Sequence, residues 1–146
     1  MVKIFLELMY CFAASYFYAL LMNAPKSTLI HSSLTASLGY IVYEICVRYG
    51  SPMLGFFLGT TLIASLGEIF ARKFKMPATI FIFPGVIPIV PGLGLYETIL
   101  AFVGDDIFLA LETGVNTILS IGCMAVAMAM VSLIALKINL KLKSNM

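Results

Sequence analysis

The residues best suited to chemistry in this sequence are gathered in one stretch, residues 83–94, which reads FPGVIPIVPGLG. Three prolines and three glycines interrupt residues that are otherwise all apolar. A proline has no backbone N–H, so Pro88 would leave the carbonyl of Pro84 without its partner in a helix. Pro91 would do the same to the carbonyl of Ile87. The stretch therefore predicts backbone hydrogen-bonding groups that are free to meet a ligand.

These groups would match the two ends of a zwitterion. A helix that restarts after the stretch would leave the N–H groups of Gly92, Leu93 and Gly94 unpaired, and the positive end of its dipole would point the same way. Such donors suit a carboxylate, whereas freed carbonyls suit an ammonium group, and nearby hydroxyls would add further bonds. The predicted substrate-binding residues are Pro84, Gly85, Ile87, Pro88, Pro91, Gly92, Gly94, Tyr96 and Thr98. The alternative is a proline kink that only shapes helix packing.

One carboxylate near the stretch has no partner at helical spacing. Glu97 is flanked by Leu93 and Ala101 at the positions four residues away. An unpaired carboxylate within a membrane is by default a candidate for function. The alternative is that it reaches interfacial water near Gly104. We therefore expect Glu97 to be a candidate for proton coupling.

Two other carboxylates precede an arginine by four residues, the favourable order for a pair on a helix. Glu44 is expected to pair with Arg48, and Glu68 with Arg72, at helix ends. The functional alternative is proton coupling, for which Glu68 is the better candidate because it continues the helix face of Gly59. The candidates for proton coupling are thus Glu68 and Glu97.

The composition excludes an ordinary soluble domain. The chain has 146 residues, of which 62% are hydrophobic and 11% charged, against roughly 25% charged residues in soluble proteins. A net charge of +2 is too small to suggest binding to nucleic acid. The three cysteines lie isolated in apolar runs, and no metal or cofactor motif accompanies them. With one histidine and no catalytic motif, the sequence does not indicate an enzyme.

The elements that must position these groups are apolar runs separated by polar turns. They predict an all-α integral membrane protein of about five transmembrane helices, folded as a single domain over residues 1–146. Hydrocarbon cannot satisfy freed backbone groups, so the break in the fourth helix must lie inside protein or beside a watery cavity. Transporters hold their solutes at such breaks. The expected segments are about 4–22, 29–47, 52–70, 77–103 and 113–136.

Details of these segments lead to further expectations. Gly55 and Gly59 have GxxxG spacing in the third segment, and Gly67 lies two turns further on, so close helix packing is expected there. Gly104 begins a polar boundary, and an acidic connector leads to Glu112 before the last segment.

The distribution of charge predicts how the chain is oriented. Five crossings would place Lys3 and Arg48 on one side of the membrane and the other Lys and Arg residues on the opposite side. Because cytoplasmic loops are rich in Lys and Arg, we expect the N-terminus outside and the C-terminus inside, in the cytoplasmic (inner) membrane. If residues 77–103 doubled back instead of crossing, this bias would be weaker. The second group is Lys26, Arg72, Lys73, Lys75, Lys137, Lys141 and Lys143.

The central stretch resembles the signature PGxIPxxPGxxxY of the threonine/serine exporter family. The chain is similar in length and number of apolar segments to the short YjjB-like subunit of the split, two-chain members. Weaker likenesses are residues 23–25, Gly39 and residues 75–79. Position 97 is not typically acidic in the family, so the resemblance gives Glu97 no role. The residues that fall on the signature are Pro84, Gly85, Ile87, Pro88, Pro91, Gly92 and Tyr96.

This resemblance implies export of small amino acids or related organic acids, driven by the proton gradient. It also implies a larger YjjP-like membrane subunit as partner, and a homo-oligomer would serve the same need to enclose a path. Two alternatives from other classes are a membrane scaffold or assembly subunit that contacts no solute, and a channel formed by a homo-oligomer.

Overall fold

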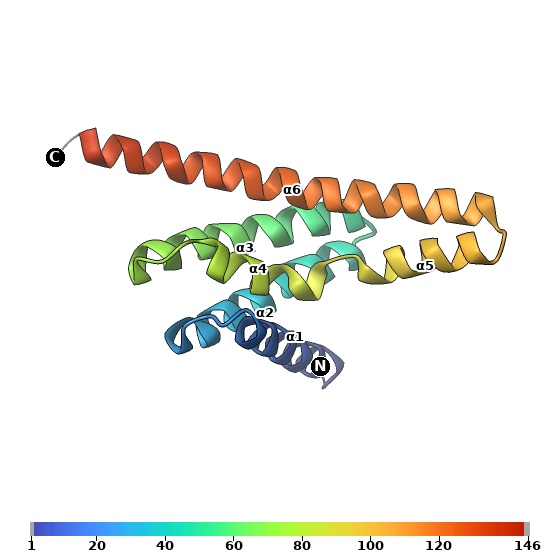
Figure 1. Ribbon diagram of the computed structural model, residues 1–146, viewed down its shortest axis with the longest axis horizontal. Coiled ribbons are helices and arrows are strands. Elements are labelled where there is room, and N and C mark those ends of the chain that lie inside the picture. The colour runs from blue at the N-terminus through green and yellow to red at the C-terminus, as the bar shows by residue number, and fades with distance from the viewer. Residues whose placement is uncertain (1, 145–146) are drawn as a thin grey trace.

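The structure is a computed structural model that describes the backbone of residues 2–144 and the side chains of residues 3–138, and every regular element in this part is helical (Figure 1). The all-α fold with a broken fourth segment is therefore confirmed. The elements are α1 (Val2–Leu21), α2 (Lys26–Arg48), α3 (Pro52–Phe74), α4 (Thr79–Val86), the 3₁₀ turn η1 (Ile87–Ile89), α5 (Gly92–Val103) and α6 (Ile107–Ser144).

Successive helices run back and forth along one direction, with α4, η1 and α5 together making one pass (Figure 1). The turns after α1 and α3 and the C-terminal part of α6 lie at one end of the bundle, which we call the basic end. The N-terminus and the turns after α2 and α5 lie at the opposite end. The two ends of the chain are thus separated as expected for an odd number of passes.

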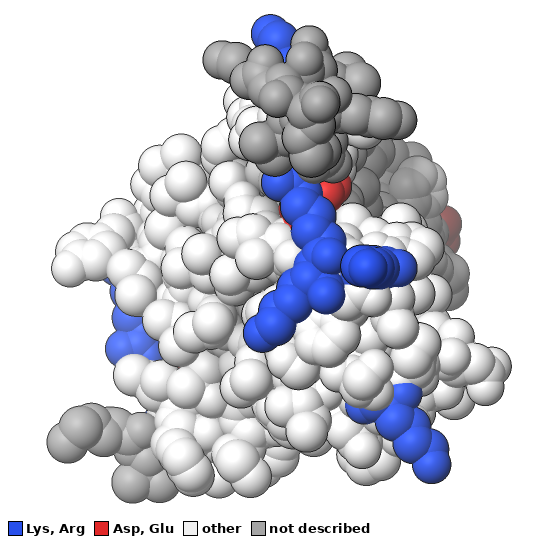
Figure 2. Space-filling model, turned by 90° about the vertical axis from the view of Figure 1, so that its left-hand side faces the viewer, with Lys and Arg blue, Asp and Glu red and all other residues white. Residues whose placement is uncertain are grey.

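Lys and Arg side chains are spread over the basic end, which faces the viewer in Figure 2. The side chains of Lys141 and Lys143, which the charge argument also used, lie outside the described residues. The exposed basic residues that the sequence places at this end are Lys26, Arg72, Lys73, Lys75 and Lys137.

Helices α1, α3 and α6 are long and apolar enough to cross a membrane, and the bent pair of α4 and α5 would make a fourth span. Helix α2 does not meet this criterion. Its 23 residues would extend about 34 Å at 1.5 Å per residue, but its many polar side chains lower its hydropathy. Four of the five expected spans are therefore apolar enough, and α2 is the exception.

The polar residues of α2 are accounted for by its central place, because it packs against α1, α3 and α4. Thr28, Ser32, Ser33 and Thr35 are fully buried. Each donates its hydroxyl proton to a carbonyl about one turn back in the chain, over 2.8–3.0 Å. Buried hydroxyls satisfied in this way carry little penalty. The most polar helix of the chain is thus an interior helix.

Glycines bring α2 and α3 into close contact, as their spacing predicts. A Cβ atom on Gly59 would lie 3.0 Å from the carbonyl oxygen of Gly39, and one on Gly55 would lie 3.0 Å from that of Tyr43. Gly67 packs instead on Ile82 of α4. An apolar core fills the space where α3, α4, η1 and α6 meet, and its buried members are Phe56, Ile63, Ala64, Ile82, Val86, Ile89 and Met124.

Two helices extend beyond the expected segments. Helix α3 continues to Phe74, where Lys75 ends it in the left-handed conformation with φ of 54°. Helix α6 begins at Ile107, so Glu112 lies inside it rather than in a connector. Helix α6 begins this early because the Asp106 carboxylate accepts a hydrogen bond from the backbone N–H of Leu109 (3.1 Å), which caps the helix.

We predict that Gly59→Ala lowers the free energy of unfolding by about 1–3 kcal/mol, the usual effect of overpacking, because the added methyl group would push α2 away from α3. Gly122→Ala is the matched control, since nothing lies within 4 Å of its Cβ position and alanine favours a helix. Thermal unfolding in detergent measures both. A Gly59→Ala protein as stable as the wild type would contradict this account of the packing.

Candidate functional site

The fourth segment breaks in three steps. Helix α4 passes through Pro84 and tightens into the 3₁₀ turn η1 at Pro88. Val90 is then extended (φ −59°, ψ 130°), and Pro91 (φ −75°, ψ 58°) has the geometry of an inverse γ-turn. Helix α5 restarts at Gly92, and the two halves of the segment are bent by 54°.

The restart of the helix at Gly92 leaves two of the three predicted N–H donors without a backbone acceptor in the described part of the chain. The N–H of Gly92 donates to the carbonyl oxygen of Val90 (2.7 Å), which closes the turn. The N–H of Leu95 donates to Pro91 (3.3 Å) and begins the regular pattern of α5. Between them, the N–H groups of Leu93 and Gly94 have no backbone acceptor in the described part of the chain. The prediction is thus wrong for Gly92, because the turn uses its N–H, and holds for the next two residues.

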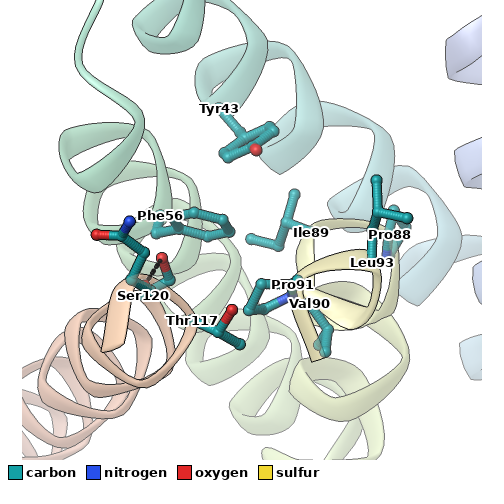
Figure 3. Close-up of a pocket in the computed structure, with 11 residues that line it drawn as sticks. Tyr43, Phe56, Pro88, Ile89, Val90, Pro91, Leu93, Thr117 and Ser120 are labelled. Carbon is teal, nitrogen blue, oxygen red and sulfur yellow. Dashed lines mark hydrogen bonds between the residues drawn. The ribbon is translucent and has the colours of Figure 1, made fainter. Parts of the chain in front are cut away.

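A cleft of about 320 Å³ lies at this break (Figure 3). Residues 88–91 with Leu93 and Gly94 form one wall. Tyr43 of α2 and Phe56 of α3 form a second, aromatic wall, with their rings 4.9 Å apart. The third wall comes from α6 and consists of Asn116, Thr117 and Ser120.

The α6 wall is polar although its helix is otherwise apolar. Thr117 and Ser120 are only 5% and 6% exposed. Their hydroxyls donate to the carbonyls of Thr113 (2.7 Å) and Asn116 (2.8 Å), one turn back, so their oxygens keep lone pairs with which to accept. The exposed Asn116 carboxamide offers both a donor and an acceptor. This wall therefore adds hydrogen-bond acceptors to the cleft that Leu93 and Gly94 also line.

Gly94 sets the distance between these two walls. A Cβ atom at this position would overlap the Thr117 side chain, with the hydroxyl oxygen as its nearest contact. Gly92, two residues earlier, has nothing within 4 Å of its Cβ position. Glycine at position 94 thus allows the start of α5 to approach the polar face of α6.

The structure brings together only part of the predicted set. Pro88, Pro91 and Gly94 line the cleft, while Ile87 and Gly92 adjoin it in the chain without lining it. Pro84 and Gly85 are buried. A Cβ atom on Gly85 would contact Ile63 and Thr35. Pro84 and Gly85 therefore serve to pack α4 into the bundle.

The two predicted hydroxyls lie further along α5. Tyr96 is 62% exposed and does not line the cleft. Thr98 donates to the Gly94 carbonyl (2.7 Å), and its oxygen lies 3.2 Å from the hydroxyl of Thr113. Thr98 therefore ties α5 to α6.

Of the two predicted ion pairs, one forms and the other does not. Arg48 and Glu44 form the expected ion pair (3.0 Å). Arg72 and Glu68 do not pair in the described part of the chain, so this expectation is wrong. The reason is that α6 packs along α3 and offers both groups other partners: Arg72 donates to the carbonyl of Ala135 (2.9 Å), and Glu68 accepts from Ser132 (3.3 Å).

The carboxylates chosen from the sequence lie away from the cleft. Glu68 lines a shallow hollow between α3 and α6 together with Arg72. Glu97 is exposed on α5, beside a hollow of about 390 Å³ that it shares with Leu109 and Thr113. Neither residue lines the cleft.

Sequence reasoning missed the α6 wall and Tyr43. The last expected segment, residues 113–136, was assigned no site residue. The available signal was that residues 116, 117 and 120 are all polar and lie on one side of a helix at a spacing of one, three and four residues. Tyr43 carries no comparable signal, because tyrosines are common near membrane surfaces.

Comparisons with known proteins identify the family of this chain. A family model described as "Threonine/Serine exporter, ThrE" matches residues 7–134, which include every wall of the cleft. A curated protein of Corynebacterium glutamicum named threonine/serine exporter is 31% identical over 83 residues, which are 57% of this chain and 17% of that protein. The chain thus corresponds to less than a fifth of that relative's length. No solved structure matches the chain.

We predict that the cleft is filled with water. In a protein whose Cys11, Cys46 and Cys123 are replaced by serine, Asn116→Cys should react with a charged methanethiosulfonate reagent. Ile118→Cys should not, because this position is 68% exposed on α6 but does not line the cleft, and charged reagents do not enter lipid. Labelling of membrane vesicles measures both rates. No reaction at position 116, or equal rates at the two positions, would contradict the prediction.

Proposed function

Because the chain belongs to the threonine/serine exporter family, we propose that it is a subunit of a membrane transporter that exports small amino acids such as threonine and serine, or related organic acids. The observation that carries this proposal is the cleft at the helix break, which has free N–H groups on one wall and hydroxyl and carboxamide oxygens on another. The family is one of exporters, which is not an enzyme class.

The cleft is suited to a small zwitterion. The N–H groups of Leu93 and Gly94 stand at the start of α5, where the helix dipole is positive, and would bind the carboxylate. The oxygens of Asn116, Thr117 and Ser120 would accept bonds from the ammonium group. A volume of about 320 Å³ leaves room for a side chain of a few atoms and some water.

We place the chain in the cytoplasmic (inner) membrane as a multi-pass protein whose basic end faces the cytoplasm. The N-terminus would then lie outside and the C-terminus inside. Support for a crossing by the fourth segment comes from its course, because α4 and α5 continue in the same general direction and are bent by 54° without turning back (Figure 1).

A larger YjjP-like partner subunit is part of the proposal, with a homo-oligomer as the other way to enclose the path. The part of the chain that matches the relative of Corynebacterium glutamicum covers 17% of that protein. Helix α5 also packs mainly on α6 and leaves a broad apolar surface, which includes Leu93, Ile99 and Val103, for lipid or a partner.

Export against a gradient needs a driving ion, and we propose protons. Glu68 and Glu97 remain the sequence-based candidates for coupling. Glu68 is half-buried with a serine hydroxyl as its hydrogen-bond partner, and Glu97 is exposed beside Thr113.

We predict that Thr117→Val reduces export of threonine by about tenfold or more, since a hydrogen bond to a charged group contributes roughly 1.5–3 kcal/mol. Valine has nearly the same shape as threonine and lacks only the oxygen. Efflux of labelled L-threonine is measured from cells that contain the chain and its partner, at matched protein levels. Ile118→Val on the outer face of α6 is the control. Unchanged efflux in the Thr117→Val protein would remove the solute from this cleft.

A further inference from the structure

Helix α1 turns one stripe of residues toward the bundle, and a carboxylate begins this stripe. Glu7, Cys11, Ser15 and Ala19 follow at intervals of four residues, and the last three are 7%, 0% and 0% exposed. The Glu7 side chain is 23% exposed. Its Oε2 atom is fully buried and has no hydrogen-bond partner within the described residues. Glu7 is thus a carboxylate in an apolar span with one oxygen unsatisfied.

The charged form of this group is poorly compensated. The nearest cation is Lys3, whose Nζ atom lies 3.9 Å from the other oxygen, Oε1, and whose side chain is 85% exposed. An exposed pair at this distance contributes little. Burying an ionised oxygen without a donor is unfavourable, whereas a proton on the carboxyl group removes the charge. The surroundings of Glu7 therefore offer its buried oxygen neither a hydrogen-bond donor nor a close cation within the described residues.

Titratable side chains face Glu7 from two elements. On α1 they are Lys3 and Cys11, and on α2 it is Tyr40, which also lies within reach of the charge of Glu44. Helix α4 and η1 also pack on α1, and their residues 79–89 include no titratable side chain. A hydrogen bond from the Ser37 hydroxyl to the Leu8 carbonyl (3.4 Å) joins α1 to α2 at this level.

Tyr40 lies between a hollow on the α2 side and the residues of the break. Glu7 does not line this hollow. A hollow of about 160 Å³ beside Tyr40 extends to Glu44 and Arg48 at the opposite end, which is the outer end in the proposed orientation. On the inner side, the rings of Tyr40 and Tyr43 are 6.2 Å apart, and Tyr43 lines the cleft. Helix α1 also packs directly on η1, the turn that forms the break.

From this arrangement we infer that Glu7 is the carboxylate that takes up and releases the driving proton. The inference rests on the proposed function and names the coupling residue of that same transporter. The proton enters from the end of the bundle opposite the basic end, by way of the hollow at Tyr40 and Glu44. It binds the Glu7 carboxylate to give the neutral acid. Loss of the charge at Glu7 changes how its buried oxygen is accommodated on the side of α1 that packs on the bundle, and the contact of α1 with η1 links this change to the cleft.

The test compares Glu7→Gln with Glu68→Gln, Glu97→Gln and the exposed control Glu112→Gln. Each protein is reconstituted with its partner into liposomes loaded with labelled L-threonine. Efflux driven by an imposed pH gradient and threonine–threonine exchange without a gradient are both measured. We expect only Glu7→Gln to lose the response to the gradient while it keeps exchange at the wild-type level.

The inference is overturned if the Glu7→Gln protein responds to the gradient like the wild type, or if it loses exchange as well. If Glu68→Gln or Glu97→Gln alone loses the response, the inference fails and the proposed function stands. If the wild-type protein moves no threonine in either assay, the proposed transport of threonine fails instead.

A second measurement does not depend on transport. A hydrophobic carbodiimide adds to a protonated carboxyl group within a membrane, and mass spectrometry locates the adduct. We expect an adduct at Glu7 that decreases as the pH is raised and is absent from the Glu7→Gln protein. A Glu7 that stays unmodified at every pH would overturn the inference, whatever the transport assays give.

Discussion

The structure depends on one constraint: prolines inside an apolar segment cannot supply the N–H groups that a continuous helix needs. Pro88 tightens the chain into η1, and Pro91 ends it, so α5 must start afresh at an angle of 54°. Lipid cannot satisfy the groups that this break exposes. The rest of the molecule accordingly surrounds the break with protein, through α2 and α3 on one side and the long α6 on another.

The surrounding helices meet this constraint in different ways. Glycines at positions 39 and 59 let α2 and α3 approach closely, so that Tyr43 and Phe56 form a firm aromatic wall. Helix α6 contributes a polar face within an apolar helix, and Gly94 lets the restarted helix rest on Thr117. Groups that can donate and groups that can accept hydrogen bonds thus line one small cleft, in which we propose that a zwitterionic solute binds.

Much of this could be predicted from the sequence because local chemistry determines it. The break at residues 83–94 follows from proline spacing, and the contact of α2 with α3 follows from Gly55 and Gly59. The rest depends on which helices meet. Arg72 was expected to pair with Glu68, but the Ala135 carbonyl on α6 is its actual partner. The Asn116 wall likewise becomes part of a site only when α6 lies against the break.

The central claim is that the free N–H groups at the restart of α5 bind the carboxylate of the solute. Nuclear magnetic resonance of the ¹⁵N-labelled protein in a membrane mimetic tests it directly, by titration with L-threonine. We expect the amide signals of Leu93 and Gly94 to shift and then saturate, while the amide of Ala101, inside the same helix, stays in place. Signals at 93 and 94 that do not move, or that move no more than that of Ala101, would contradict the claim.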